Sequence, residues 1–87
     1  MKNLYFIEVT DNHDGEARYS WVIRHCIAAK SKRGAVSVLS RRSGINWRHD
    51  YGERYNSVSG ATCAFINYYE PEYHDHFYFA TDDRKGN

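Results

Sequence analysis

The fold of this chain is decided by residues 17–27, which run ARYSWVIRHCI. Aromatic and β-branched side chains alternate there with smaller or polar ones, which is the period-two pattern of a β-strand. Residues 4–9, LYFIEV, have the composition of another strand. The turn formers of residues 11–15 lie between the two segments. Two strands joined by a short polar turn predict an antiparallel hairpin.

A helix is predicted to follow the hairpin, over residues 31–43. The hydroxyl of Ser31 can accept a hydrogen bond from a free amide of the first turn, and Gly44 suits the left-handed position after a helix. The apolar residues of the segment form one narrow stripe: Ala35, Val36, Val38 and Leu39. The helix is therefore expected to cover one face of a sheet.

The remainder of the chain is predicted to supply further strands. Residues 45–50 have strand composition, and residues 54–57 extend the pairing. Residues 61–69 form the clearest strand and are apolar on both faces in the middle, which favours a central place in the sheet. A last strand is expected at residues 76–80. Residues 81–87 are polar and are expected to form a loose tail.

This order of elements, ββαβββ, predicts the fold class. It corresponds to a single α+β domain over residues 1–87, in which an antiparallel sheet of four to five strands carries one α-helix packed on one face. The stripe of the helix is narrow, whereas the sheet has aromatic residues on both faces. Some aromatic surface is therefore expected to stay exposed, and such patches commonly mark an interaction site.

Composition restricts the class of protein. Aromatic residues make up 16% of the chain, which is too many for a disordered protein, although the mean hydropathy is −0.80. No apolar run approaches the roughly 20 residues of a membrane span, and the first residues, MKNLYFIEVTDNH, lack the features of a signal peptide. We therefore expect a cytoplasmic protein with no membrane partner, and the host cytoplasm if it is phage-encoded.

The charge distribution is uneven, although the net charge is only +1. The segment from Ala17 to His49 holds eight Lys or Arg and no Asp or Glu, so all eleven acids lie outside it. Lys32 and Arg33 fall in the first turn of the helix, where the helix dipole disfavours cations. We interpret these cations as residues that bind a partner and do not serve helix stability. The expected partner-binding residues combine these cations with nearby aromatic rings: Arg24, Lys30, Lys32, Arg33, Arg41, Arg42, Trp47, Arg48, Tyr51 and Tyr55.

Catalytic and metal signals are weak. Cys26 and Cys63 lie in apolar stretches and are expected to be buried thiols, although their spacing leaves open whether they are neighbours in space. The phosphate-binding, dinucleotide-binding and nucleophile-elbow motifs are absent. His74 and His76 have the spacing that places two imidazoles on one strand face, which suits a transition metal. They remain a weak candidate for a metal site or enzyme, so no cofactor and no catalytic residue is expected.

The layout resembles that of small phage-encoded host-takeover inhibitors, the anti-CRISPR proteins among them. The resemblance rests on the hairpin of LYFIEVT and ARYSWVIRHCIAA, the helix in SKRGAVSVLSRRSG and the returning strand SGATCAFINYY. It is architectural, and no functional residue is carried over from it. It implies a non-enzymatic inhibitor that docks on a host protein or nucleoprotein such as a CRISPR effector. Many such inhibitors are acidic mimics of nucleic acid, and the basic helix departs from that pattern.

Two alternatives accompany this hypothesis. The first is a nucleic-acid-binding domain that uses the basic helix 31–43, with Trp47, Tyr51 and Tyr55 stacking on single-stranded bases. The second is the metal-binding protein or enzyme based on His74 and His76. An uncovered aromatic sheet face also makes a homodimer a reasonable expectation.

Overall fold

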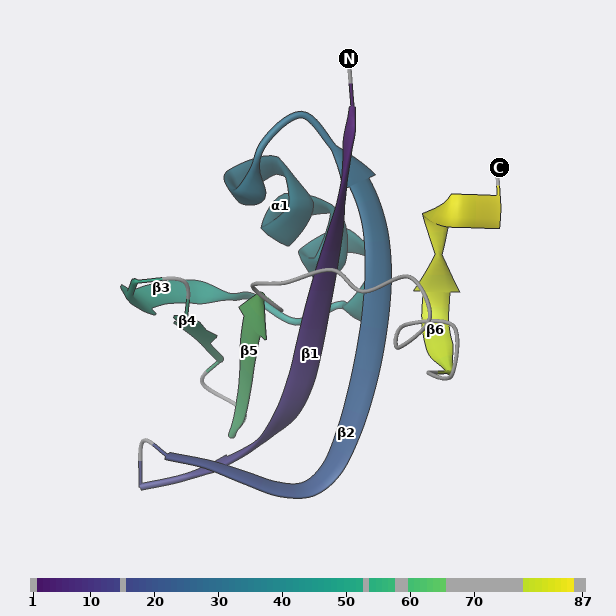
Figure 1. Cartoon of the computed structure of the whole chain (residues 1–87). Helices are drawn as coiled ribbons and strands as arrows, with labels where there is room; N and C mark the ends of the chain where they lie inside the picture. The colour runs from purple at the N-terminus through teal and green to yellow at the C-terminus, as the bar shows by residue number, and fades with distance from the viewer. Residues whose placement is uncertain (1, 15, 53, 58–59, 66–77, 86–87) are drawn as a thin grey trace.

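A long, curved hairpin forms the centre of the structure, which is a computed structural model (Figure 1). The strands β1 (Asn3–His13) and β2 (Glu16–Ala29) pair antiparallel, as the alternation of apolar residues predicts. Both strands extend further into the predicted turn than expected, so that only Asp14, with φ of 53°, is described as a turn residue. The structure describes residues 2–14, 16–52, 54–57, 60–65 and 78–85.

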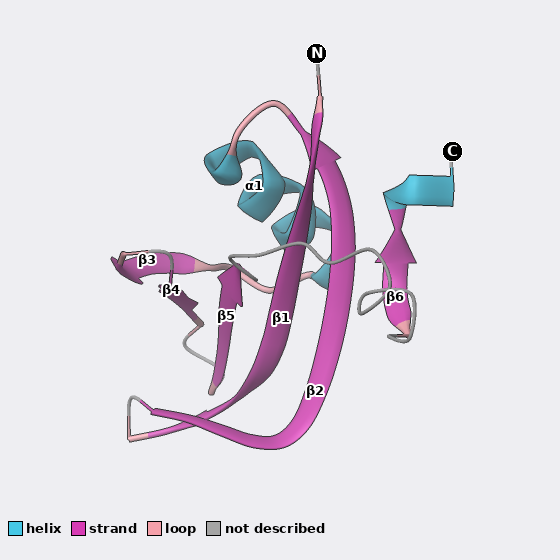
Figure 2. Ribbon diagram, viewed as in Figure 1, coloured by secondary structure: helices cyan, strands magenta, loops and turns pink. Residues whose placement is uncertain are grey.

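Four shorter strands complete a six-stranded sheet. They are β3 (Arg48–Tyr51), β4 (Arg54–Asn56), β5 (Ala61–Phe65) and β6 (Phe79–Asp82). The order across the sheet is β3-β4-β5-β1-β2-β6, so β5 lies in the interior, as its apolar composition predicts. Figure 2 shows that the hairpin strands are much longer than the others. The fold class α+β, with one α-helix, is confirmed.

The expectation of a purely antiparallel sheet of four to five strands is wrong. β6 pairs with β2 in parallel, at the opposite edge of the sheet from β3. Parallel neighbours need a crossover connection, and a local sequence pattern does not specify which edge a strand will join. The consequence is a mixed sheet that brings the end of the chain beside β2 (Figure 1).

The helix α1 (Lys32–Ser43) has the boundaries and caps that the sequence predicts. Ser31 accepts a hydrogen bond from the Gly34 amide through its side chain at 3.1 Å. Gly44 is left-handed, with φ of 71°, and donates its amide to the Ser40 carbonyl at 2.9 Å. A glycine suits this position because side chains with a Cβ rarely adopt such a φ. No helix in the described part of the chain is long and apolar enough to cross a membrane.

The two faces of the sheet carry separate cores. On the face that α1 covers, the buried residues include Ile7, Ile27, Leu39 and Phe65. On the other face, Phe6, Cys26 and Phe79 form a smaller cluster. Successive strand residues point to opposite faces, which is why neighbours such as Phe6 and Ile7 belong to different cores. The stripe of the helix is buried as expected, at Ala35, Val36 and Leu39.

Two boundary predictions differ from the structure, and a third lies partly outside the described residues. The strand expected at residues 45–50 begins only at Arg48, because the preceding residues connect α1 to the sheet. In this connection Trp47 is buried in the core and the partly buried Ile45 packs against it. The last strand, expected at residues 76–80, includes Phe79 and Ala80 and continues to Asp82. The later residues of the strand expected at 61–69, from 66 onward, lie outside the described residues.

The expectation of a loose tail at residues 81–87 is also wrong for its first part. Thr81 and Asp82 belong to β6, and a short 3₁₀-helix, η1 (Asp83–Lys85), follows. Polar side chains hold this segment, since Asp83 bonds to β2 and α1, and Arg84 bonds to Asp82. The polar composition of this segment predicted an exposed tail. In the structure its charged side chains instead form hydrogen bonds and ion pairs that hold it against β2 and α1.

Candidate functional site

A groove of about 440 Å³ lies between α1 and the β3–β4 edge of the sheet. Its volume falls within the range of about 300–1,000 Å³ that is usual for ligand sites. We call it the α1–β4 groove. Its lining residues are Arg33, Val36, Ser37, Ser40, Asn46, Trp47, His49 and Tyr55.

One wall of the α1–β4 groove is a single face of the helix. Arg33, Val36, Ser37 and Ser40 are three, four and seven residues apart, so the helical repeat places them in a row. Val36 is buried against the core, whereas Arg33 and Ser37 are exposed. The same turn-by-turn spacing that buries Leu39 therefore leaves a polar row facing the groove.

The opposite wall comes from the connector and the two edge strands. His49 of β3 lies directly across from Tyr55 of β4, and their ring centroids are 5.2 Å apart in an edge-to-face arrangement. Nε2 of His49 donates to the Gly52 carbonyl at 3.0 Å, which holds the ring at the strand edge. Asn46 and Trp47 lead into β3.

Aromatic rings continue from the α1–β4 groove across the helix-covered face. Tyr55 packs edge-on against Phe65 at 6.4 Å, and Phe65 packs in the same way against Tyr5 at 5.8 Å. Nζ of Lys32 lies 5.6 Å from the centre of the Phe65 ring. A cation over a ring face is attracted by the ring quadrupole. The cation of Lys32 therefore sits close to the aromatic row instead of extending freely from the helix.

Trp47 has an unsatisfied polar atom. The residue is only 8% exposed, and its Nε1 is buried with no hydrogen-bond acceptor in the described structure. A buried donor without a partner costs about 1–3 kcal/mol, because it gives up water without a replacement. Such groups are uncommon in native proteins. Trp47 lines the groove, but its Nε1 atom is itself closed off from solvent.

The electrostatic character of the α1–β4 groove is positive. Among the described residues, its lining contains one arginine, one histidine, two serines, an asparagine, a tyrosine and a tryptophan, and no carboxylate. Arg33 makes no ion pair or hydrogen bond with any described residue. The groove thus presents several hydrogen-bond donors and an available guanidinium, which favours a group that accepts hydrogen bonds and carries negative charge.

The structure brings together only some of the residues predicted to bind a partner. Arg33, Trp47 and Tyr55 line the α1–β4 groove. Tyr51 ends β3, where its backbone pairs with Arg54. The remaining cations of the predicted set that are exposed and make no ion pair with a described residue are Lys30, Arg41 and Arg48.

Two of the predicted partner-binding residues, Arg24 and Arg42, make ion pairs within the protein. Arg24 lies on the face that α1 leaves uncovered, where its Nε donates to Glu8 Oε2 at 3.1 Å across the hairpin. Glu8 and Arg24 are direct neighbours in the β1–β2 register, so their side chains share one face. The sequence pattern missed this pairing because the two residues are far apart in the chain.

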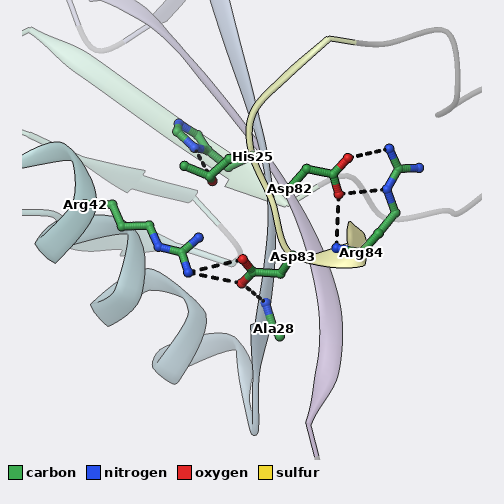
Figure 3. Close-up of polar contacts among 7 residues, drawn as sticks. His25, Ala28, Arg42, Asp82, Asp83 and Arg84 are labelled. Carbon is green, nitrogen blue, oxygen red and sulfur yellow. Dashed lines mark hydrogen bonds and ion pairs between the residues drawn. The ribbon is translucent and has the colours of Figure 1, made fainter. Parts of the chain in front are cut away.

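Arg42 is held by the end of the chain (Figure 3). Its Nη2 lies 3.2 Å from Asp83, whose carboxylate also accepts the backbone amide of Ala28 at 2.7 Å. In the neighbouring pair, Arg84 donates to Asp82 at 2.8 Å and its guanidinium lies 4.7 Å from the Phe79 ring centre. We call these contacts the C-terminal clasp, since they join η1 to β2 and α1.

His25 belongs to the same region as the C-terminal clasp. The residue is buried, and its Nδ1 lies 2.9 Å from the Thr81 hydroxyl of β6. Burial lowers the pKa of His25 below its usual 6.5, and the positive charge of Arg42 lowers it further. The lowered pKa favours the neutral imidazole, which is consistent with a structural hydrogen bond to Thr81.

The two cysteines lie on opposite faces of the sheet. Cys26 pairs with Phe6 and Cys63 pairs with Val9, and these β1 residues are separated by an odd number of positions. Burial raises the pKa of Cys26 to about 11 and that of Cys63 to about 12. Both are free thiols. The expectation of buried thiols is confirmed, and their raised pKa values argue against nucleophilic use, because the thiolate is the reactive form.

The proposed metal ligands His74 and His76 lie outside the described residues. Among the residues that the structure does describe, no group of three or more His, Cys, Asp or Glu side chains is placed to hold a metal ion. The two other histidines discussed above are engaged, since His25 contacts Thr81 and His49 contacts the Gly52 carbonyl.

A second exposed surface lies at the far end of the hairpin. Tyr19, Trp21 and Ile23 are 60%, 43% and 44% exposed, which confirms the expected exposure of aromatic residues. Tyr19 has a φ of 57°, a strained value for a bulky side chain, and its amide donates to the Thr10 hydroxyl at 3.1 Å. Asp11 supports the same irregular stretch by accepting from the Ser20 amide at 2.9 Å. Hydrogen bonding to Ser20, mainly to its side chain and also to its amide, lowers the pKa of Asp11.

Five lining residues were not predicted as site residues: Val36, Ser37, Ser40, Asn46 and His49. Ser37 and Ser40 share a helix face with Arg33, so the helical repeat alone was enough to find them. Asn46 and His49 depend on how the connector enters β3, which local patterns do not specify.

No protein-family model matches the chain, and no curated protein or solved structure is significantly similar to it.

Proposed function

We propose that this chain is a non-enzymatic binding protein that docks on a protein or nucleoprotein partner through the α1–β4 groove. The observation that carries the proposal is the groove itself, in which Arg33, Tyr55 and Trp47 meet and no described lining residue carries a carboxylate. Arginine, tyrosine and tryptophan are the residue types most enriched at protein-binding hot spots. Because Arg33 carries a positive charge and makes no ion pair with a described residue, we expect the groove to prefer an acidic surface of the partner.

The surroundings of the aromatic rings favour a protein partner over nucleic acid. Stacking on single-stranded bases needs exposed ring faces. Trp47 is 8% exposed and Tyr55 is only partly exposed, so neither ring is an open platform. Arg24 and Arg42 are also bound to Glu8 and Asp83, which removes two cations from the predicted phosphate-binding set. Nucleic-acid binding is therefore the second candidate.

The class of partner follows from the resemblance to small phage-encoded inhibitors. A CRISPR effector is the specific partner that this resemblance suggests. Expression of the chain in bacteria with active CRISPR interference is expected to reduce interference. If interference is unaffected, this partner is excluded, whereas docking through the α1–β4 groove is tested separately by the capture experiment below.

A matched pair of charge reversals tests the docking proposal. We expect Arg33→Glu to abolish retention of partner proteins from a lysate of CRISPR-bearing bacteria, whereas Arg41→Glu retains them. Both residues are exposed arginines of α1, and only Arg33 lines the groove. An acid in the first turn suits the helix dipole and one in the last turn does not. Loss of folding would therefore affect the control more than the test variant.

The outcomes separate the candidates. A partner retained by wild type and Arg41→Glu but lost from Arg33→Glu supports groove docking. Equal retention by both variants, or equal loss from both, contradicts it. Retention that disappears after nuclease treatment and weakens steeply with salt favours the nucleic-acid candidate instead.

A further inference from the structure

We propose that the outer edge of β3 pairs antiparallel with β3 of a second copy of this chain, so that two six-stranded sheets join into one. The strand β3 (Arg48–Tyr51) ends the sheet, with β4 on one side and no described strand on the other (Figure 1). An edge strand presents unpaired backbone amides and carbonyls to which another chain can add. The proposal goes beyond docking through the α1–β4 groove and does not depend on it.

The charges of β3 are complementary to those of the same strand running in the opposite direction. Arg48 and Asp50 are both exposed, and each lies one residue from His49. In an antiparallel pairing centred on His49, Arg48 of one copy is opposite Asp50 of the other, and the two-fold symmetry repeats the contact. Directly opposite residues of antiparallel strands are close enough for opposite charges to attract. Both ends of the short interface therefore carry an attractive pair.

Arg48 and Asp50 share one face of the sheet. Arg48 is opposite Asn56 in the β3–β4 register, and Nδ2 of the same Asn56 donates to Asp50 Oδ2 at 3.2 Å. The register shift between His49 and Tyr51 therefore leaves the Asp50 carboxylate on the side of Arg48. Among the described residues, Arg48 has no hydrogen-bond or ion-pair partner and Asp50 has only Asn56. The guanidinium and the second carboxylate oxygen are thus available to another copy.

The same charges disfavour the neighbouring registers. Charged residues on an edge strand usually hinder pairing with other chains. Pairings centred on Arg48 or on Asp50 place like charges opposite each other, which is destabilising. A shift by one residue turns the two helices to opposite sides of the joined sheet and brings Arg48 against His49. The charges of β3 thus favour the register centred on His49.

Pairing in this register places both copies of α1 on one face of the joined sheet. His49 and Tyr55 line the α1–β4 groove opposite α1, so each helix lies over the face that carries these rings. His49 is also the residue on the symmetry axis, so the two grooves meet there. The second copy therefore contributes its own His49 to a wider groove with one helix along each side. A four-residue strand buries little surface, so we expect a weak, concentration-dependent dimer.

Exchange of the charges of Arg48 and Asp50 tests the pairing by sedimentation velocity of the full chain over a range of concentrations. Arg48→Asp and Asp50→Arg each turn two attractive pairs into two repulsive ones, so each is expected to weaken self-association about tenfold or more. The equimolar mixture of the two variants and the double variant Arg48→Asp/Asp50→Arg restore both attractive pairs, and we expect them to dimerise as wild type does. Arg41→Asp makes the same change of charge on α1 and is expected to keep the wild-type association.

A substitution on the symmetry axis tests the register. Opposite residues of antiparallel strands have Cα atoms about 4.5–5.5 Å apart, within the roughly 4.4–6.8 Å that a disulfide spans. His49→Cys is therefore expected to form a disulfide-linked dimer on mild oxidation, whereas Arg41→Cys is not. The native Cys26 and Cys63 are buried, with pKa values raised to about 11 and about 12, so they are expected to stay unlinked.

Three results would overturn the proposal. The first is a wild-type chain that stays monomeric at every concentration. The second is self-association that Arg48→Asp and Asp50→Arg leave unchanged. The third is an equimolar mixture of these variants that does not recover the dimer, whereas recovery also shows that both variants fold. Absence of the His49→Cys disulfide would contradict the register. Docking is measured by partner capture through Arg33, so failure of the dimer is distinct from failure of the proposed function.

Discussion

The two sides of helix α1 use the same kinds of residue in opposite ways. On the side of the C-terminal clasp, Arg42 is bound by Asp83, and the buried His25 meets Thr81. On the side of the α1–β4 groove, Arg33 has no ion pair with a described residue and Trp47 Nε1 has no acceptor. The polar groups on the clasp side have hydrogen-bond or ion-pair partners within the protein. On the groove side, Arg33 and Trp47 Nε1 have none among the described residues.

This difference shows that charge alone does not identify a binding surface. Arg33 and Arg42 are equally basic and lie on one helix, yet only one of them is available to a partner. The useful criterion is whether each charged group is already bound within the protein, since a charge that is paired there is less available to a partner. By this criterion the clasp is structural and the groove is the candidate site.

The largest expected effect comes from breaking the clasp at Asp83. Its carboxylate accepts from Ala28 N at 2.7 Å and pairs with Arg42 at 3.2 Å. Asp83→Ala is expected to lower the free energy of unfolding by about 2–3 kcal/mol, because hydrogen bonds to charged groups contribute about 1.5–3 kcal/mol. Urea denaturation measures the change.

Asp50→Ala is the control for this experiment. Asp50 is exposed and accepts one hydrogen bond, from Asn56 Nδ2 at 3.2 Å. Its loss is expected to change stability by less than about 0.5 kcal/mol. If Asp83→Ala proves as stable as Asp50→Ala, the clasp is not a structural unit and the contrast with the groove disappears.

A smaller effect is expected from protonating His25. Burial and Arg42 lower its pKa in the folded protein below the 6.5 of the unfolded chain. The unfolded state therefore binds the proton more readily, so stability is fully present above pH 6.5 and is lost as the pH falls through the folded pKa. Stability measured against pH should fall more steeply below 6.5 in wild type than in His25→Gln. Identical pH profiles would show that His25 is not held neutral by its surroundings.

Parts of the fold follow directly from sequence patterns. The alternation in residues 17–27 predicts the hairpin, and Ser31 and Gly44 predict the limits of α1, because caps are local hydrogen-bonding devices. The parallel pairing of β6 could not be predicted in this way. It depends on which sheet edge the chain returns to, and nothing in residues 79–82 specifies that edge.

The sequence predicted only part of the candidate site, because some of its contacts join residues that are far apart in the chain. Arg33, Trp47 and Tyr55 were expected from charge and aromatic content and do meet in the groove. Arg42 was expected to join them, but its partner Asp83 lies 41 residues further along the chain. The lack of an acceptor for Trp47 Nε1 is likewise visible only once the burial of the ring is known.

The most direct test of the contrast is a hydrogen-exchange footprint of the full chain with and without a partner whose capture depends on Arg33. The account predicts slower amide exchange in the segments that build the groove, residues 33–40 and 46–55, with residues 79–85 unchanged. Protection confined to residues 79–85 or to the exposed hairpin residues 19–23 would contradict it, because the partner would then bind a surface other than the α1–β4 groove.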